Sequence, residues 1–460
     1  MKTNNPYNNY KTSGISWLGD IPEHWQISKA KHILFQKKKT LNPSLNCGSI
    51  SFGNIVYKDN DRVPLETKAT YQELLKGEFL INPLNLNFDL KSLRTGFSNI
   101  DVVVSTGYIV LQNNPNFNKK YLKWLLHQFD ISFMKTLGDG VRQTLSYTDF
   151  KNTDLPYISK EEQTAIANFL DYKTAKIDRF IRKKKQLIKL LNEQKSGIIN
   201  HAVTKGLNPT LKMKSSGIEW LGDIPERWEV RKLKYLGKFQ NGISASAEYF
   251  GSGFPFVNYG DIYKNFQLPI TGSGLANSSI QDQINYSVEK GDVFFTRTSE
   301  TIEEIGLTST CLRTIENATF SGFIIRFRPQ QNILFDGYSK YYFRSNLHRR
   351  FFVKEMNLVT RASLSQELLK RLPVIIPPFE EQILIYTSIE KETAKLNKAI
   401  ATIEKEITLV KEYKTALIAE AVTGKIDVRD FVIPEIIEDE TYEDLEEELD
   451  LVAEDGEEIE

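Results

Sequence analysis

The chain has 460 residues, 40% of them apolar and 26% charged, a composition typical of a globular protein with about two to four domains. Its two cysteines are far apart and its five histidines are scattered, so we expect neither a zinc site nor a disulfide framework. The N-terminal residues lack the apolar run of a signal peptide, and no segment has the length of a membrane span. This predicts a cytoplasmic protein without a membrane partner.

The formal net charge of zero conceals an uneven distribution of charge. Residues 435–460 contain 15 acidic side chains and no lysine or arginine, so the rest of the chain carries 59 basic and 44 acidic side chains. The basic part favours a polyanionic partner. We expect the acidic tail to be disordered, and two roles stay open for it: imitation of DNA or docking of a partner, and simple solubilisation.

The first globular segment, residues 12–155, contains short apolar runs at 79–81 and 102–105, broken by glycine, proline and asparagine. Such runs predict strands, and the pattern of residues 121–129 predicts a helix. The second globular segment, residues 217–372, is organised in the same way. Its expected elements are strands at 292–296 and 323–327 and a helix at 338–347.

A long helical pattern follows each globular segment, and residues 160–202 alone would form a rod of about 60 Å. Apolar residues recur at heptad spacing in both patterns, which favours coiled-coil packing. In the first pattern, Lys184 interrupts a heptad position formed by Leu170, Ile177, Leu191 and Ile198, and the companion position holds Ile166, Phe180 and Leu187. In the second, one position holds Ile389, Leu396, Ile403, Val410 and Leu417. Additional isoleucines widen the stripe, namely Ile181, Ile188, Ile400 and Ile407.

The ends of both helices carry recognisable signals. Gly206 and Gly424 are plausible C-terminal stops, while Pro156 and the pair Pro377-Pro378 precede the helices. Two kinds of pairing fit the periodicity: the helices pair with each other within one chain, which would place the globular segments at opposite ends of a bar, or they pair between chains.

The chain contains a long internal repeat. Residues 12–27 and 215–230 are identical at 11 of 16 positions, including the motif Trp-Leu-Gly-Asp-Ile-Pro. Further residues return at an offset of 219, such as Glu162-Gln163 at Glu381-Gln382. The segments between these blocks differ. Two interpretations remain: two related recognition tasks on one scaffold, or drift in a duplicated structural protein.

Four motifs together resemble the specificity subunit of type I restriction–modification systems, and they span residues 12 to about 430. They are Trp17 to Pro22 with Trp25 and its copy Trp220 to Pro225 with Trp228, Leu372-Pro373 with 377–382, residues 421–427, and the strand and turn 291–299. The first half departs from the pattern, because Asn82-Pro83-Leu84 stands where the second half has Thr296-Arg297-Thr298, and Ser159-Lys160 replaces the proline pair.

The resemblance implies an α+β (mixed α/β) fold in which two target-recognition domains alternate with two long helices that pair as an antiparallel coiled coil, a pseudo-twofold repeat. The expected domains are residues 1–158 and 207–376 for recognition, 159–206 and 377–424 for the helical spacers, and 425–460 for the acidic tail. Each recognition domain would read one half of a bipartite target, and the helices would fix the spacing because major grooves recur at about 34–36 Å.

The resemblance also implies partners: double-stranded DNA, two modification subunits and restriction subunits. S-adenosylmethionine, ATP and Mg²⁺ would belong to those subunits, and this chain would be non-catalytic. The sequence contains no phosphate-binding loop, and in Pro377-Pro378-Phe379, which is similar to an amino-methyltransferase motif, Ile376 replaces the polar residue. A self-contained methyltransferase or nuclease and a coiled-coil scaffold without DNA affinity are the alternatives.

Several residues are candidates for DNA contact. Arg297, Thr298 and Ser299 leave a strand and enter a polar loop, where arginine can bind guanine through two hydrogen bonds. Arg142 and Arg361 lie in repeated turns and would either position phosphates or join a domain to its helix. Basic patches contribute further candidates, which compete with plain solvation: Lys37, Lys38, Lys91 and Arg94.

Other residues are candidates for structural roles. The basic run 182–185 lies on the first helix and either faces solvent as a coiled-coil flank or contacts DNA or a partner subunit. Large aromatic side chains usually anchor cores, so the four tryptophans of the repeated motif would lock each domain onto the helix pair. The interface residues that we expect are Trp17, Trp25, Trp220, Trp228, Ile177, Leu191, Leu396 and Ile403.

Overall fold

The computed structural model describes residues 6–434, except for 60–62, 85–92, 135–136, 138–143, 299–304, 349 and 353–363. The chain divides into two units, each with its own globular part and its own portion of the two long helices. Unit 1 lies within Met1–Arg182 and Ile407–Glu460, and unit 2 is Lys183–Glu406. The acidic tail, residues 435–460, lies outside the described residues.

Unit 1 contains a six-stranded sheet in the order β4–β11–β8–β9–β6–β5. Its strands are β4 (Leu34–Gln36), β5 (Gly48–Ser51), β6 (Asn54–Tyr57), β8 (Phe79–Ile81), β9 (Thr95–Phe97) and β11 (Ile109–Asn113). A separate pair joins β7 (Gln72–Leu74) to β10 (Val102–Val104). The strands predicted at 79–81 and 102–105 are therefore confirmed. Helix α2 (Lys119–Ser132), which begins where the Asn118 side chain accepts the backbone N–H groups of Lys120 and Tyr121, confirms the predicted helix.

Unit 1 contains further elements outside this sheet. The hairpin of β1 (Tyr10–Thr12) and β2 (Asp20–Pro22) carries the repeated tryptophan motif, and β3 (Gln26–Lys29) pairs with β12 (Asp154–Tyr157) just before the long helix. One core joins the sheet, α2 and the ends of both long helices. The short helices are η1 (Ala30–His32), α1 (Leu65–Ala69) and α3 (Tyr147–Lys151).

Unit 2 is also a mixture of strands and helices, but its main strands form two sheets in place of one. Four strands form the order β16–β22–β19–β20, and three form β18–β17–β21. They are β16 (Gly237–Asn241), β17 (Phe250–Val257), β18 (Gly274–Ala276), β19 (Val293–Thr296), β20 (Thr308–Thr310), β21 (Thr319–Phe320) and β22 (Ile324–Pro329). The strands predicted at 292–296 and 323–327 are confirmed, and the predicted helix 338–347 is α7 (Asp336–Tyr342) followed by the 3-10 turn η7 (Asn346–His348).

The elements that join unit 2 to its helices match those of unit 1. A hairpin of β13 (Met213–Ser215) and β14 (Asp223–Pro225) again carries the tryptophan motif, and β15 (Glu229–Lys232) pairs with β23 (Pro373–Ile376). The duplicated sequence therefore folds into duplicated attachments. The shorter helices are η4 (Leu233–Tyr235), η5 (Ala247–Tyr249), α5 (Tyr259–Lys264), α6 (Ile280–Asn285) and α9 (Gln366–Arg371).

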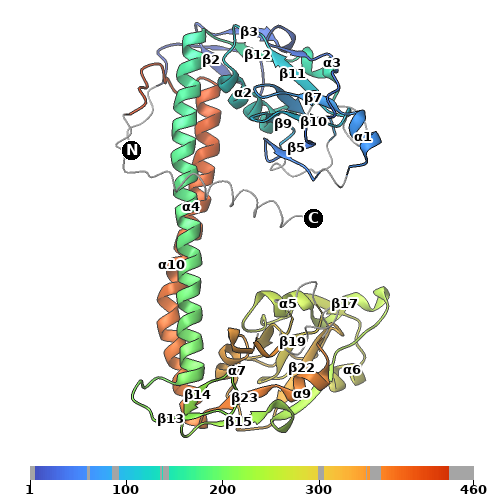
Figure 1. The fold of residues 1–460 in the computed structure, drawn as a ribbon, viewed down its shortest axis with the longest axis vertical. Coiled ribbons are helices and arrows are strands. Elements are labelled where there is room, and N and C mark those ends of the chain that lie inside the picture. Colours follow the sequence, from blue (N-terminus) through green and yellow to red (C-terminus); the bar gives the residue numbers. More distant parts are fainter. Residues whose placement is uncertain are drawn as a thin grey trace. The chain divides into compact units, whose positions relative to one another are not determined.

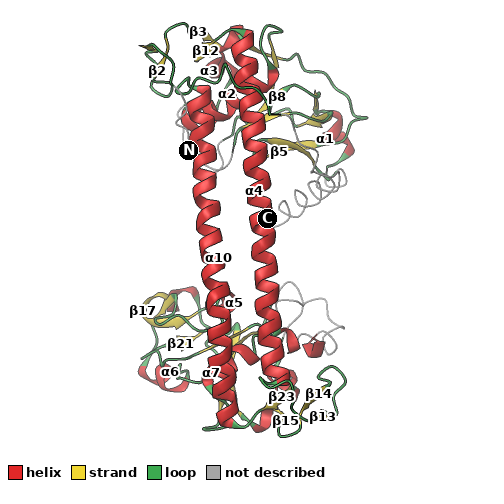
Figure 2. Cartoon of the chain, turned by 90° about the vertical axis from the view of Figure 1, so that its left-hand side faces the viewer, coloured by secondary structure: helices red, strands yellow, loops and turns green. Residues whose placement is uncertain are grey.

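The two long helices are α4 (Lys160–Lys205) and α10 (Phe379–Val422), and they pair within one chain. In unit 1, Lys414 Nζ lies 2.6 Å from Asp178 Oδ1. In unit 2, Lys184 Nζ lies 2.9 Å from Glu406 Oε2 and Lys195 Nζ lies 2.8 Å from Asn397 Oδ1. Numbers that rise along α4 fall along α10, so the pairing is antiparallel, as Figures 1 and 2 show within each unit.

The helices bury a heptad stripe, but one predicted position is confirmed only at Ile166, which is buried. The expected residues Ile177, Leu191 and Leu396 are half-buried and Ile403 is buried. Phe180 and Leu187, however, are 36% and 40% exposed. The companion position is held instead by Thr174, Ile181 and Ile188 on α4 and by Thr393, Ile400 and Ile407 on α10. Along α4 the two positions alternate at steps of three and four residues, and Lys184 occupies one of them. The helix pair accommodates this lysine because it forms an ion pair with Glu406 of the opposite helix.

Both helices end at the predicted glycines. Gly206 and Gly424 adopt φ values of 77° and 73°, a left-handed conformation that other residues rarely adopt. Pro377 and Pro378 directly precede α10, whereas Pro156 lies within β12. Among the described residues, no helix is long and apolar enough to cross a membrane.

Candidate nucleic-acid interface

The repeated tryptophans attach each globular part to the ends of the long helices. Trp25 Nε1 donates to Glu162 Oε1 at 2.9 Å, and Trp228 Nε1 donates to Glu381 Oε2 at 2.9 Å. Each indole also packs on the glycine that ends the opposite helix, because a Cβ on Gly424 would lie 3.0 Å from Trp25 and one on Gly206 3.3 Å from Trp228. Each tryptophan thus joins the start of one helix to the end of the other.

Neighbouring repeated residues make a second set of matching attachments. The Asn118 N–H donates to Gln163 Oε1 at 2.7 Å, and the Phe335 N–H donates to Gln382 Oε1 at 2.8 Å. Further along each helix, Trp124 Nε1 donates to Asp171 and the Tyr341 hydroxyl donates to Glu390, both at 2.8 Å. The sequence repeat at offset 219 was the signal for these roles, which sequence reasoning did not assign.

The first tryptophan of each motif has a different place. Trp17 is half-buried with its ring 5.6 Å from Phe129, in the core that joins α2 to the helix pair. Trp220 is half-buried with its ring 6.3 Å from Phe351. The four tryptophans therefore lie in or against the cores and do not form an exposed surface.

In unit 2 the strand β19 ends at a set of exposed and half-buried side chains that we call the second edge: Arg297, Thr298 and Phe323. The Arg297 N–H donates to the Phe323 carbonyl at 3.0 Å, and the Arg297 carbonyl accepts the Leu364 N–H at 2.7 Å. The guanidinium is half-buried, with Nη1 3.4 Å from the Gly322 carbonyl, while Thr298 is exposed. Phe323 is 64% exposed, and its neighbouring backbone is hydrogen-bonded on both sides.

Unit 1 has a corresponding place, which we call the first edge, at Asn82 and Pro83, where β8 ends and β9 begins. The Leu145 N–H donates to the Pro83 carbonyl at 2.9 Å, just as Leu364 does to Arg297, so Pro83 occupies the position of Arg297. Proline has no N–H for the bond that Arg297 makes and no cationic side chain. The first edge must therefore present other chemistry than the second.

The basic candidates of unit 1 lie in different environments. Arg94 directly precedes β9 and is only 3% exposed, and its guanidinium makes no hydrogen bond to the described part of the chain. Burial lowers the pKa of Arg94, opposed by the nearby Asp130 carboxylate. Lys37 is bound between Glu73 and Glu78, with Nζ to carboxylate distances of 3.2 and 2.9 Å. Lys38 is exposed.

Four predicted contact residues lie outside the described residues, namely Lys91, Arg142, Ser299 and Arg361. Of the candidates that the structure describes, Arg297 and Thr298 lie side by side at the second edge. Lys37 follows β4 and Arg94 precedes β9, and both side chains are withdrawn from solvent.

Phe52, which sequence reasoning did not single out, lies at the first edge. It forms the two-residue turn between β5 and β6 with Gly53, and its φ is 44°. A bulky residue in this left-handed region costs about 1–2 kcal/mol, and asparagine or glycine is the usual choice in such a turn. The side chain is nevertheless 62% exposed.

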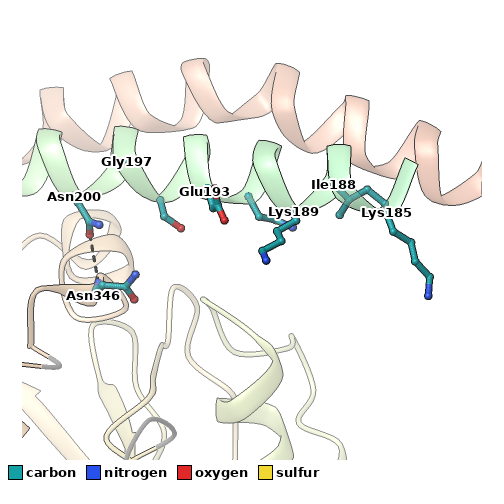
Figure 3. A pocket seen from close by; sticks show the side chains of 9 residues that line it. Lys185, Ile188, Lys189, Glu193, Gly197, Asn200 and Asn346 are labelled. Carbon is teal, nitrogen blue, oxygen red and sulfur yellow. Dashed lines mark hydrogen bonds between the residues drawn. The ribbon is translucent and has the colours of Figure 1, made fainter. Parts of the chain in front are cut away.

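A groove of about 790 Å³ runs along the part of α4 that belongs to unit 2. Its lining includes Lys185, Lys189 and Asn200 of α4, and the Asn346 N–H donates to Asn200 Oδ1 at 3.3 Å (Figure 3). Lys185 and Lys189 point away from α10 in this view. The basic run 182–185 thus includes one residue that lines a groove and another, Lys184, that pairs with Glu406.

Within the described part of the chain, no three His, Cys, Asp or Glu side chains come together as a possible metal site. Cys47 and Cys311 are both buried and are not joined by a disulfide. What the geometry provides is a pair of α+β domains, each attached in the same way to one pair of helices and each with a different set of side chains at the same strand end. These features define a protein with two similarly attached domains in tandem.

A family model described as "Type I restriction modification DNA specificity domain" matches residues 22–190 and 225–409, and the chain therefore belongs to this family. The MjaX type I restriction enzyme specificity subunit of Methanocaldococcus jannaschii is 25% identical over 443 residues, which cover 90% of this chain and 96% of that protein. The MjaVIII specificity subunit of the same organism is 28% identical over 229 residues, 48% of this chain and 51% of that protein.

A solved chain from a study of complex assembly and conformational transition in a type I restriction–modification system has the same fold. It is 15% identical, with a TM-score of 0.61 over 88% of this chain and 99% of that chain. The family places this protein among the specificity subunits of type I systems. These subunits recognise DNA and assemble with modification and restriction subunits, and catalysis resides in those partners.

Proposed function

We propose that each globular part reads one half-site of a bipartite target in double-stranded DNA and that the paired helices fix the spacing between the half-sites. The observation that carries this proposal is the contrast between the two edges. The attachments to the helices are the same in both units, whereas the side chains at the strand ends differ, with Pro83 in one and Arg297 in the other. Shared attachments with different edges suit two different half-sites.

The functional division of the chain follows from this proposal. Residues 1–158 and 207–376 are the recognition domains, residues 159–206 and 377–424 are the helical spacers, and residues 425–460 are the acidic tail. The duplicated attachments offer two equivalent surfaces, which suits two copies of one modification subunit. S-adenosylmethionine, ATP and Mg²⁺ act in the modification and restriction subunits, and the complex works on DNA in the cytoplasm.

Arg297 is the leading candidate for direct reading in the second domain. Its backbone is fixed by hydrogen bonds to Phe323 and Leu364, and its guanidinium has a long contact, 3.4 Å, to the Gly322 carbonyl. An arginine held in this way can donate two hydrogen bonds to O6 and N7 of guanine in the major groove, an interaction worth about 1–3 kcal/mol of discrimination. Thr298, exposed beside it, is suited to a phosphate or a base.

The test is to map genomic adenine methylation in cells that express this chain with its modification subunits, and then to repeat the mapping with Arg297→Ala. We expect a bipartite target, with discrimination relaxed about tenfold to a hundredfold at one base pair of one half-site in the variant. Lys290→Ala is the matched control, because Lys290 is a basic residue near the opposite end of β19 that pairs with Asp336 at 3.4 Å. An unchanged target in Arg297→Ala would remove Arg297 from the reading surface.

A further inference from the structure

The first edge lacks the arginine of the second, so another residue must contact DNA there if the first domain reads a half-site. The turn between β5 and β6 supplies one. Ser51 pairs with Asn54, which leaves Phe52 and Gly53 as the two turn residues, with φ values of 44° and 82°. Positive φ at both positions is the requirement of a tight hairpin turn that asparagine and glycine satisfy best.

The sheet topology brings this turn to the first edge. Strand β6 runs parallel to β9, with Asn54 opposite Phe97, so the residues before both strands lie at the same end of the sheet. Strand β8 is antiparallel to β9, with Ile81 opposite Thr95, so Asn82 and Pro83 lie at that end as well. The turn also touches its neighbour directly, because a Cβ on Gly53 would lie 2.7 Å from Leu93 Cδ1.

Two features of Phe52 are unfavourable for folding alone. Its backbone is in a conformation that a phenylalanine rarely adopts, and its ring is 62% exposed to solvent. Burial of the ring therefore does not compensate for the backbone strain, as it would for a core residue. Strained residues that persist without a packing role gather at binding sites.

We propose that Phe52 contacts a base in the half-site read by the first domain, with the C5-methyl group of a thymine as its partner. This inference rests on the proposed function. The ring offers no hydrogen-bonding group, so it cannot bind a phosphate, whereas apolar contact with the thymine methyl is an established way to read the major groove. The rigid two-residue turn holds the ring in place before DNA arrives.

The test uses the full chain in complex with its modification subunits and a duplex that contains the mapped target. Affinity is compared with duplexes in which the first or the second half-site is scrambled, for the wild type, Phe52→Asn and Tyr57→Asn. Tyr57 is the matched control, since it is 59% exposed at the far end of β6, the strand that follows the turn. The Asn substitution removes the ring but suits the positive φ, so thermal stability should stay the same or rise.

We expect Phe52→Asn to lose about tenfold of the discrimination at the first half-site and none at the second, while Tyr57→Asn keeps both. Replacing the contacted thymine by deoxyuridine should weaken the wild type to the same extent and leave Phe52→Asn unaffected. Unchanged discrimination in Phe52→Asn, or a loss accompanied by a lower melting temperature or failed assembly, overturns the proposal for Phe52. A wild-type complex that discriminates neither half-site overturns it together with the proposed function.

Discussion

At the scale of single residues, some arginines of the second globular part serve the fold. Arg328 lies 2.6 Å from the buried Asp292 and 2.7 Å from Glu289, and Arg344 donates to the carbonyls of Ile262 and Thr308 at 2.9 Å each. Such arginines contribute to the basic charge of the chain without being available to DNA. Basic composition therefore indicates a polyanionic partner but does not identify the residues that contact it.

His127 on α2 should make unit 1 sensitive to mild acid. Burial, aided by Lys414 and Lys123, lowers the pKa of His127 from 6.5 to about 4. Between these values the unfolded chain binds the proton and the folded chain does not, so the stability that is present above pH 6.5 is lost as the pH falls towards 4, by about 2 kcal/mol. The melting temperature at pH 7 and pH 4.5 measures this loss.

The variant His127→Asn should reduce this pH dependence, because it removes the group that titrates. Two carboxylates that cap short helices act below this window. Hydrogen bonds from Ser146 and Ser279 lower the pKa values of Asp149 and Asp282 below 3.8, so their contribution is lost only at lower pH. Equal pH dependence in the wild type and in His127→Asn would assign the acid sensitivity to other groups.

At the scale of elements, the attachments of the two units are similar but unequal. Glu162 is 3% exposed and accepts hydrogen bonds from Trp25 at 2.9 Å and from the Tyr7 hydroxyl at 2.6 Å, with His24 Nε2 at 2.9 Å from its other oxygen. Glu381 is half-buried and accepts the Trp228 N–H at 2.9 Å. Loss of the first carboxylate thus leaves more buried donors without a partner.

We predict that Glu162→Ala destabilises the protein by about 2–4 kcal/mol and Glu381→Ala by about 1–2 kcal/mol, because each buried donor left unpaired costs about 1–3 kcal/mol. Denaturant unfolding of the two variants beside the wild type measures the difference. Glu162→Gln is the control, since its amide oxygen can still accept from Trp25 and Tyr7 but carries no charge, and it should lie between the wild type and Glu162→Ala. Equal losses in the two alanine variants would contradict this account.

The sequence predicted the elements well because their signals are local or repeated. Heptads and terminal glycines marked α4 and α10, and apolar runs marked β8 and β19. The seam was misassigned at Phe180 and Leu187 because hydrophobicity favoured them, whereas packing chose a stripe that includes Thr174 and Lys184. Polar residues can occupy such a stripe when the opposite helix pairs with them, and a single sequence does not reveal those pairs.

The recognition edges were harder to predict. Arg297 was found because it follows a strand with a recognisable pattern. Arg94 was a candidate by charge, but its burial depends on contacts between distant segments, with its N–H donating to Asp130 of α2. Phe52 carried no signal at all, because a phenylalanine before glycine does not predict a tight turn. Only the structure shows that the backbone of this residue is strained and that its side chain is exposed.

At the scale of the whole molecule, the proposed function depends on a match between protein and DNA periodicity. If the paired helices fix the half-site spacing, seven residues inserted into each helix at the level of the Lys184–Glu406 pair lengthen the spacer by about 10 Å. This equals about three base pairs, or roughly a third of a DNA turn. The insertion preserves the heptad register, so the helices should still pair.

We predict that this double insertion abolishes modification of the original target, because the second half-site no longer faces its domain when the first is bound. Each domain keeps its own edge, so discrimination at either half-site alone should persist in binding assays with the assembled complex. Replacement of the same heptads by others of equal length is the control and should leave the target unchanged. Methylation mapping of the insertion variant decides the matter: retention of the original spacing would mean that the helices do not set it, and that the half-site separation is determined by the partner subunits.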